Sequence, residues 1–325
     1  MKPWTLLVTT RSFGREVPEP MERLKQAGIR IVEWREGSGL AESDLLDKLA
    51  ETDAWAVSFH PIGPKQLDAA PRLKLIAKHG VGVDNIDIAE ATKRGVIITT
   101  APSANDQAVA DLTMALLLSM LRRIPEASAS VKAGRWDRFL GFGMNGKIMG
   151  ILGLGRIGQN VARRAKGFGV ELIGADPVWP DAAARDIGIR QVTMPELFAT
   201  ADIISLHAPL TRETEGLIGG HEIAQMKPGV WIVNTSRGKV VNEKALYDAL
   251  VSRKVAGYAS DVFEKEPPGF NPLFLLPNVI GTPHMGTHTR ESIQQMGDRV
   301  ADAVLSVFRG ERPENVVNPE VFARR

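Results

Sequence analysis

The sequence predicts an α/β fold built from two doubly wound units, each with a parallel β-sheet covered by helices. Short apolar runs alternate with amphipathic stretches along most of the 325 residues, and this alternation is typical of successive βαβ units. A long apolar stretch interrupts the alternation after about residue 103, and the alternation resumes at Lys147. The chain length also predicts two domains, because a domain typically has ~100–200 residues.

The composition is that of an ordinary globular protein. Hydrophobic residues make up 44% and charged residues 24%, which excludes a disordered chain, a collagen and a coiled coil. The net charge is +2, so nothing favours a nucleic acid or a membrane surface as the partner. The absence of cysteine excludes disulfides and thiolate catalysis. With no signal peptide and no apolar run near ~20 residues, we expect a cytoplasmic protein.

The first hundred residues contain five short apolar runs that we expect to be strands. These runs are Leu6–Thr9, Ile29–Trp34, Ala54–Phe59, Leu73–Ala77 and Val96–Thr99. Helical patterns lie between them, at Glu19–Ala27 and Ser43–Ala50. Ser43 is the predicted N-cap of the second of these helices, because a serine side chain can accept a hydrogen bond from a first-turn N–H.

A buried helix is predicted from about Ser103 to Arg123, because its apolar residues lie on several faces. Pro125 is expected to end this helix. The following segment, 134–146, is rich in glycine and aromatic residues and has no clear period. We interpret it as a linker or an interface loop.

The second half of the chain contains six further candidate strands and a final long helix. The strands are Ile148–Leu152, Glu171–Ala175, Ile203–Leu206, Val230–Asn234, Ala256–Ala259 and Asn278–Ile280. The helix is predicted over Thr287–Arg309 and is expected to return to the first unit. We therefore predict a flavodoxin-like unit of residues 1–101 plus 289–325, and a Rossmann-like unit of residues 102–288.

The segment from Gly153 to Gly158 is a G-x-G-x-x-G motif between a predicted strand and a predicted helix. In this context Gly153 allows a tight turn, Gly155 lets the backbone approach a pyrophosphate, and Gly158 lets the helix pack on the sheet. The helix N-terminus offers unpaired N–H groups to the phosphates. Asp176 ends the next strand, where its carboxylate can bind ribose hydroxyls and repel a 2′-phosphate.

The motif therefore predicts a dinucleotide site that prefers NAD to NADP, with Arg156 and Ile157 included in it. The glycine motif by itself does not identify the reaction, because a methyltransferase can share a glycine-rich loop and an acidic strand end. The residues that follow later strands favour a dehydrogenase.

Three side chains at predicted strand ends carry the candidate catalytic chemistry. Arg237 follows Val230–Asn234 and can clamp a carboxylate through two parallel hydrogen bonds. Glu266 and His284 follow the next two strands, and a histidine beside a carboxylate is suited to proton transfer near neutral pH. His207 ends another strand, either beside the adenine part of the cofactor or as a packing residue. No group of side chains has metal-ligand spacing, so we expect no metal.

Five segments in order make the chain resemble the D-isomer-specific 2-hydroxyacid dehydrogenases over almost its whole length. They are His79–Asp87, Asn105–Asp111, Gly153–Gly158 with Asp176, Asn234–Gly238, and Asp261–Pro267 with Pro283–His284. The resemblance implies a discontinuous substrate domain and a central NAD domain, with the active site in the cleft between them. It also implies a dimer in which the loop around Trp136 reaches toward the partner.

The resemblance implies a role for each site residue. Arg237 would bind the substrate carboxylate and carbonyl, His284 would exchange the proton, and Glu266 would pair with His284. In the substrate domain, backbone N–H groups of Val81 and Gly82 would hold the carboxylate. The predicted cofactor contacts are Val109 on the nicotinamide ring, Thr235 and Asp261 on its carboxamide, and His207, Pro209 and Thr214 along the cofactor.

The resemblance leaves the substrate open. Phosphoglycerate dehydrogenases of the family hold the phosphate with basic residues, and Lys78 lies where one is expected. No arginine occurs around Ser58–His60, where a second base is common, and His60 is the candidate substitute. Asp111 stands where the family often has glutamate, and we assign it no role.

The predicted function is hydride transfer between NAD and C2 of a small 2-hydroxy acid, with no nucleic-acid or membrane partner. The candidate substrates are 3-phosphoglycerate, hydroxypyruvate, glyoxylate and a longer sugar acid. The alternative of a different class is an NAD-sensing binding protein on the same fold.

Overall fold

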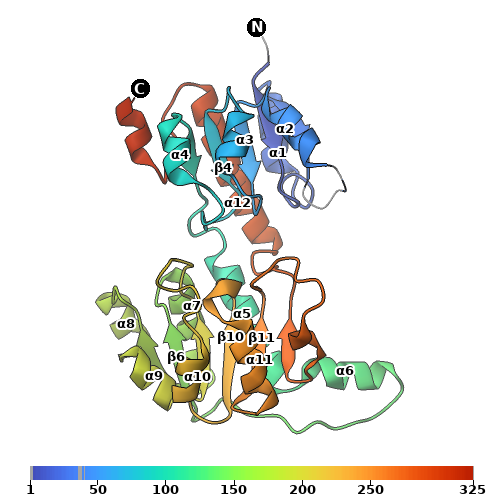
Figure 1. Ribbon diagram of the computed structural model, residues 1–325, viewed down its shortest axis with the longest axis vertical. Coiled ribbons are helices and arrows are strands. Elements are labelled where there is room, and N and C mark those ends of the chain that lie inside the picture. The colour runs from blue at the N-terminus through green and yellow to red at the C-terminus, as the bar shows by residue number, and fades with distance from the viewer. Residues whose placement is uncertain (1–2, 36–38, 40, 325) are drawn as a thin grey trace. The chain divides into compact units, whose positions relative to one another are not determined.

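The computed structural model of the protein describes residues 3–35, 39 and 41–324, and its contacts divide the chain into two compact units (Figure 1). The first unit comprises residues 1–105 and 288–325, and the second comprises residues 106–287. The sequence had placed these boundaries after residues 101 and 288.

The difference at the first boundary has a packing explanation. The N–H of Ala101 donates to the carbonyl of Gly80 at 2.8 Å, and the side chains of Ala101 and Ala104 pack with Ile293 and Met296. All of these partners belong to the first unit. Residues 102–105 therefore stay with the first unit, and the chain leaves it only after Asn105.

The first unit has a five-stranded parallel sheet in the order β2-β1-β3-β4-β5. Its strands are β1 (Thr5–Val8), β2 (Arg30–Glu33), β3 (Ala54–Val57), β4 (Leu75–Lys78) and β5 (Ile97–Thr99). Its helices are α1 (Glu19–Gln26), α2 (Glu42–Leu49), α3 (Pro64–Asp68), α4 (Ile88–Lys93), α12 (Arg290–Phe308) and the 3₁₀ helix η3 (Pro319–Arg324).

Both faces of this sheet are buried, as parallel sheets require. Leu6 and Val8 of β1 pack with Val304 of α12 on one face, whereas Leu7 packs with Leu45 of α2 on the other. This alternation follows from the two-residue period of a strand.

The C-terminal segment is fastened to the edge of the same sheet. The side-chain oxygen of buried Asn318 accepts the N–H of Ile98 at 2.8 Å, and its amide donates to the carbonyl of Val96 at 2.9 Å. Val316 also forms an antiparallel bridge with Thr99. The end of the chain is therefore an integral part of the first unit.

The second unit has a seven-stranded parallel sheet in the order β12-β11-β10-β9-β6-β7-β8. Its strands are β6 (Ile148–Leu152), β7 (Glu171–Ala175), β8 (Arg190–Gln191), β9 (Ile203–Leu206), β10 (Val230–Asn234), β11 (Val255–Ser260) and β12 (Val279–Gly281). Its helices are α5 (Asp106–Leu121), α6 (Ile124–Lys132), α7 (Arg156–Lys166), α8 (Asp181–Ile187), α9 (Met194–Thr200), α10 (Gly220–Gln225), α11 (Glu243–Val251), η1 (Gly238–Val240) and η2 (Pro272–Leu275).

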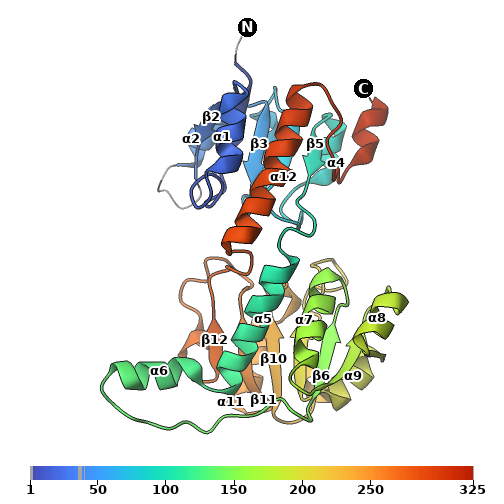
Figure 2. The same ribbon diagram turned by 180° about the vertical axis from the view of Figure 1, so that it is seen from behind.

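Helices cover both faces of this sheet as well. Helices α9, α10 and α11 pack on the face that lies toward the viewer in Figure 1. Helices α5, α7 and α8 pack on the opposite face, which Figure 2 turns toward the viewer. The strand order reverses between β6 and β9, and ligands of such sheets bind at the carboxyl ends of the strands at this point. The predicted fold class of two doubly wound parallel-sheet units is confirmed.

The predicted long helix is wrong at both ends. Ser103 has a φ of +64°, which is incompatible with a right-handed helix, so α5 begins only at Asp106. Arg123 has a φ of +51° and breaks the helix after Leu121. Pro125 therefore does not end α5 but lies in the first turn of α6, where a proline needs no N–H donor.

One smaller prediction is also corrected, and one short strand was missed. Ser43 is not a cap but lies inside α2, which begins after Ala41, and the carboxylate of Asp44 accepts the N–H of Ala41 at 3.2 Å. The two-residue strand β8 was not predicted, because Arg190 and Gln191 are both exposed and carry no apolar pattern. Among the residues that the structure describes, no helix could span a membrane.

Candidate active site

The glycine loop between β6 and α7 contains two glycines that the fold itself requires. Gly153 has a φ of +92°, and a Cβ added there would lie 2.7 Å from the backbone of His207. A Cβ on Gly158 would lie 2.1 Å from the carbonyl oxygen of Gly153. A Cβ on Gly155, in contrast, would meet nothing within 4 Å. The open space beside Gly155 fits a pyrophosphate that approaches the backbone there.

Asp176 at the end of β7 fastens the glycine loop. Its Oδ2 accepts the N–H of Leu154 at 2.6 Å, and its Oδ1 accepts the N–H of Val178 at 2.7 Å. Each carboxylate oxygen keeps a further lone pair that can accept a ribose hydroxyl. Arg156 is exposed in the first turn of α7, and Ile157 packs partly against the core. The α7 N-terminus, the open loop and the carboxylate together fit a dinucleotide.

The segment after β9 runs beside the glycine loop, because the N–H of His207 donates to the carbonyl of Leu152 at 2.7 Å. The Nε2 of His207 is hydrogen-bonded to Ser205 Oγ at 2.7 Å, and its Nδ1 is buried with no partner among the described residues. Burial lowers the pKa of His207 to about 3, so its ring is neutral. Thr214 Oγ1 donates to the carbonyl of Pro209 at 2.6 Å and so closes the following turn.

Arg237 lies in a turn that is held by the side chain of buried Asn234. Asn234 Oδ1 accepts the N–H of Ser236 at 3.0 Å, and its Nδ2 donates to the carbonyl of Arg237 at 3.0 Å. Gly238 lies so close to Phe263 that an added Cβ would be 1.9 Å from the Phe263 carbonyl carbon. This approach holds the Arg237 turn against the loop that carries Glu266.

Glu266 and His284 form a hydrogen-bonded pair. His284 Nδ1 lies 2.6 Å from Glu266 Oε2, and Glu266 Oε1 accepts the N–H of Phe263 at 3.0 Å. Burial alone would raise the pKa of Glu266, but the hydrogen bond and charge of His284, the Phe263 N–H and the charge of Arg237 together lower it. Glu266 is therefore ionised and able to orient the imidazole. His284 has a φ of +51°, a strained backbone that often marks functional sites.

Buried Asp261 at the end of β11 holds the loop that contains His284. Its Oδ1 accepts Thr282 Oγ1 at 2.6 Å and the N–H of Met285 at 2.8 Å, and its Oδ2 accepts the N–H of Gly286 at 2.7 Å. Burial raises the pKa of Asp261, although these three hydrogen bonds act to lower it. In this structure Asp261 therefore organises the His284 loop, a role that the sequence did not predict.

Val109 and Thr235 lie near this loop on neighbouring elements. A Cβ on Gly286 would be 3.3 Å from a methyl group of Val109. Thr113 Oγ1 donates to the carbonyl of Val109 at 2.7 Å, so it accepts from Thr235 Oγ1 at 2.7 Å, because a hydroxyl has one hydrogen. The hydroxyl of Thr235 therefore keeps acceptor capacity for a ligand N–H. Sequence reasoning missed Thr113, which no motif marked.

The predicted substrate residues of the first unit lie at the end of β4 and in the loop that follows it. Val81 is exposed and Gly82 half-buried, in the loop before α4. The buried ammonium of Lys78 donates to the carbonyl of Ser58 and to Asn85 Oδ1. The Nδ2 of Asn85 donates to the carbonyl of His60 at 2.6 Å. At least two of the three N–H donors of Lys78 therefore bind the loops that contain Ser58 and Asn85.

Asp111 forms an exposed ion pair with Arg164, at 2.7 Å, between α5 and α7. Within the described part of the chain, no group of three or more histidine, aspartate or glutamate side chains could hold a metal ion.

The second unit matches a known family. Residues 114–286 match the family model for the NAD-binding domain of D-isomer-specific 2-hydroxyacid dehydrogenases. The chain is 47% identical over 285 residues to a D-3-phosphoglycerate dehydrogenase from Methanocaldococcus jannaschii, covering 86% of this chain and 54% of that protein. It is 42% identical over 318 residues to a glyoxylate reductase from Thermococcus litoralis, covering 95% of this chain and 96% of that protein.

Solved structures agree with this match. A glyoxylate reductase from Paecilomyes thermophila superposes with a TM-score of 0.86 at 32% identity, over 98% of this chain and 99% of that one. A D-lactate dehydrogenase from Aquifex aeolicus, solved with NAD and lactic acid, has a TM-score of 0.84 at 29% identity, over 96% and 98%. The chain spans about half the length of the phosphoglycerate dehydrogenases it matches.

The glycine loop yields a prediction that separates ligand binding from folding. Gly155→Ala places a methyl group in open space, so the thermal midpoint should stay close to wild type while NADH binding weakens ~10-fold or more, because the added methyl blocks the pyrophosphate. Gly158→Ala forces a 2.1 Å clash and should lower the midpoint. Titration of intrinsic fluorescence with NADH and a thermal melt measure the two effects. Unchanged NADH affinity in Gly155→Ala would rule out this pyrophosphate site.

The buried histidine after β9 yields a pH prediction. The pKa of His207 is about 3 in the folded protein and 6.5 as its ordinary value, so between these pH values only the unfolded chain binds the proton. The free energy of unfolding should therefore fall as the pH is lowered from 6.5 toward 3. His207→Gln should reduce this dependence by about 1.4 kcal/mol per pH unit.

Urea denaturation at a series of pH values between 4 and 8 measures this slope. His221→Gln, at an exposed position of α10, is the matched control. Equal slopes in His207→Gln and wild type would contradict the burial of a neutral imidazole.

Proposed function

The chain belongs to the D-isomer-specific 2-hydroxyacid dehydrogenase family, whose members are NAD-binding oxidoreductases acting on CH–OH groups, and we propose that it reduces a small 2-oxo acid to the D-2-hydroxy acid, or catalyses the reverse. The observation that carries the proposal is the Glu266–His284 hydrogen bond beside the Arg237 turn. All three side chains follow neighbouring strands of one parallel sheet.

Each of these side chains has a distinct task in the proposed reaction. NADH, when bound at the glycine loop, supplies the hydride. Because Nδ1 of His284 faces Glu266, its Nε2 is the atom that gives a proton to the carbonyl oxygen and takes it back in reverse. Arg237 binds the substrate carboxylate and stabilises the negative charge that develops on the carbonyl oxygen. Ionised Glu266 holds the imidazole in the orientation and tautomer that this requires.

The proposed cofactor contacts beyond the glycine loop follow the same elements. Val109 would pack on the nicotinamide ring, and Thr235 would accept the carboxamide N–H. Asp261 is proposed to act on the nicotinamide site through the loop it holds as well as through its remaining lone pair. Backbone N–H groups at Val81 and Gly82 would hold the substrate carboxylate.

Two proposals for the substrate differ in whether it carries a phosphate group. Similarity to phosphoglycerate dehydrogenases supports 3-phosphoglycerate, with Lys78 as a phosphate ligand. The Lys78 ammonium already donates hydrogen bonds to Ser58 and Asn85. This favours instead a substrate without a phosphate, such as glyoxylate or hydroxypyruvate. We propose the second class as the better fit to this lysine.

An activity panel tests the function. We expect NADH oxidation, followed at 340 nm, with glyoxylate or hydroxypyruvate and less with phosphohydroxypyruvate, pyruvate or 2-oxoglutarate. His284→Ala should lower kcat by ~10²–10⁴-fold, because a positioned general acid contributes that much. Arg237→Ala should lower kcat/KM, whereas Lys239→Ala, an exposed cation two residues away, should not.

The panel also addresses the alternative of an NAD-sensing protein. NADH binding with no turnover of any member would favour that alternative. Full activity of His284→Ala would refute the assignment of the proton donor. If phosphohydroxypyruvate were the preferred substrate, the proposal that Lys78 binds a phosphate would be the better one.

We further propose that the protein works as a homodimer in the cytoplasm. The segment after α5 exposes apolar side chains in a short stretch of chain: Val131 is 56%, Trp136 78% and Leu140 88% exposed. Exposed apolar clusters of this kind mark protein interfaces, and a second copy of the chain is the partner we propose.

Sedimentation equilibrium should then give twice the mass of one chain. Leu140→Asp should shift the equilibrium to monomer, because it puts a charge into the apolar interface. Val251→Asp, which changes another exposed apolar residue on α11, should leave the dimer intact. A monomeric wild-type protein at micromolar concentration would overturn the proposal.

A further inference from the structure

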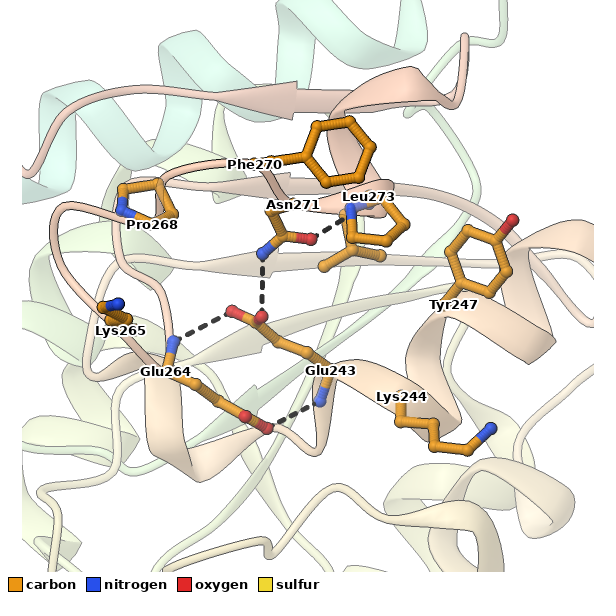
Figure 3. A pocket seen from close by; sticks show the side chains of 10 residues that line it. Glu243, Lys244, Tyr247, Glu264, Lys265, Pro268, Phe270, Asn271 and Leu273 are labelled. Atoms are coloured by element: carbon orange, nitrogen blue, oxygen red, sulfur yellow. Dashed lines mark hydrogen bonds between the residues drawn. The ribbon is translucent and has the colours of Figure 1, made fainter.

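The loop between β11 and β12, which carries Glu266, is fastened to the start of α11 by one carboxylate. Glu243 Oε1 accepts the N–H of Glu264 at 2.8 Å, and Glu243 Oε2 accepts Nδ2 of Asn271 at 2.8 Å. Figure 3 shows the Glu243 carboxylate between these two partners. Because Glu264 and Asn271 lie on either side of Glu266 in the chain, Glu243 holds both ends of the segment that presents the catalytic carboxylate.

Two further hydrogen bonds complete this arrangement. The N–H of Glu243 donates to Glu264 Oε1 at 2.9 Å, which makes the Glu243–Glu264 contact reciprocal. The N–H of Leu273 donates to Asn271 Oδ1 at 3.0 Å. Because the oxygen of Asn271 already serves Leu273, its amide nitrogen must face Glu243, so the orientation of this amide is determined.

The fastened end of the loop is continuous with the catalytic pair. Glu264 follows Phe263, whose N–H holds Glu266 Oε1, and the other oxygen of Glu266 faces His284. The same Phe263 packs against Gly238 in the Arg237 turn. Glu243 begins the helix that follows this turn. It therefore joins the segment that carries Arg237 to the segment that carries Glu266.

We propose that Glu243 is a positioning residue for the Glu266–His284 pair, acting through Glu264 and Asn271. The inference rests on the proposed function for its kinetic consequence, but the geometry concerns the protein alone. A carboxylate on a loop orients a histidine only if the loop backbone is held, and a displacement of ~1 Å can cost ~10²-fold in rate. The charged groups that act on Glu266 are His284 and Arg237, which approach it from two other strand ends.

Two substitutions each break the contact between Glu243 and Asn271. When they are combined, donor and acceptor change places and the hydrogen bond is restored. In Glu243→Gln, one oxygen still accepts the Glu264 N–H, but the new amide nitrogen faces the Asn271 nitrogen, donor against donor. In Asn271→Asp, two carboxylates face each other. In the double variant, the new amide at position 243 donates to the new carboxylate at position 271, whose other oxygen still accepts the Leu273 N–H. The double variant also keeps the net charge.

Each single variant should lower kcat by ~10–10²-fold with KM within about twofold, and the double variant should recover most of the loss. The second readout needs no substrate: the ¹³C shift of the Glu266 side-chain carboxyl, followed against pH and assigned with Glu266→Gln. Displacing the loop changes both the burial that raises the pKa of Glu266 and the bonds from His284 and Phe263 that lower it, so this pKa should shift in both single variants and return in the double variant.

Two control variants separate positioning from general stability. Thr193→Ala removes the N-cap bond to Glu196 of α9 and should lower the thermal midpoint without moving the Glu266 titration. Lys244→Ala, an exposed cation next to Glu243, should change neither. A wild-type Glu266 titration in both single variants, or a double variant as impaired as the singles, would overturn the proposal. If wild type turns over no substrate, the proposed function fails while the titration still decides the role of Glu243.

Discussion

The parallel direction of the strands in the second unit is the constraint on which the candidate site depends. Strands β6, β9, β10, β11 and β12 all run the same way, so the segments that follow them meet at one edge of the sheet. This edge receives the glycine loop, the turn of Arg237, and the loops of Glu266 and His284. A sheet of mixed direction would send some of these segments to the opposite edge. The candidate site is therefore assembled from segments distant in the chain, from the glycine loop at Gly153 to His284.

At this edge, polar side chains hold the loops by binding backbone N–H and carbonyl groups. Asp176 holds the glycine loop, Asn234 the Arg237 turn, and Asp261 the His284 loop. A buried backbone group without a partner costs ~1–3 kcal/mol, so the buried bond from the Gly286 N–H to Asp261 favours one particular conformation of the His284 loop. Glu243 belongs to the same class, with the difference that it holds a loop at two places. The candidate catalytic side chains are thus supported by other side chains that hold the loops around them.

Close backbone contacts complete this support. Gly153 lies against the His207 backbone, and Gly238 lies against Phe263, at distances that leave no room for a Cβ. Only glycine allows such contacts, because any side chain would force the segments apart. Gly155 differs from these two because no protein atom lies where its side chain would be. The same residue type thus serves packing at two positions and leaves space for a ligand at the third.

The sequence by itself determined the fold class, most strand positions, the glycine loop and the choice of Arg237, Glu266 and His284 as candidates. These features depend on local patterns, namely apolar periodicity, glycine spacing and polar residues directly after strands. Tertiary structure decided the rest. The left-handed backbone at Ser103 and Arg123 set the ends of α5, although neither residue type signals it. The bonds of Asp261 to Gly286 and of Glu243 to Asn271 join segments distant in sequence, and hydrogen-bond partners across such distances follow from the packed fold and not from any local spacing.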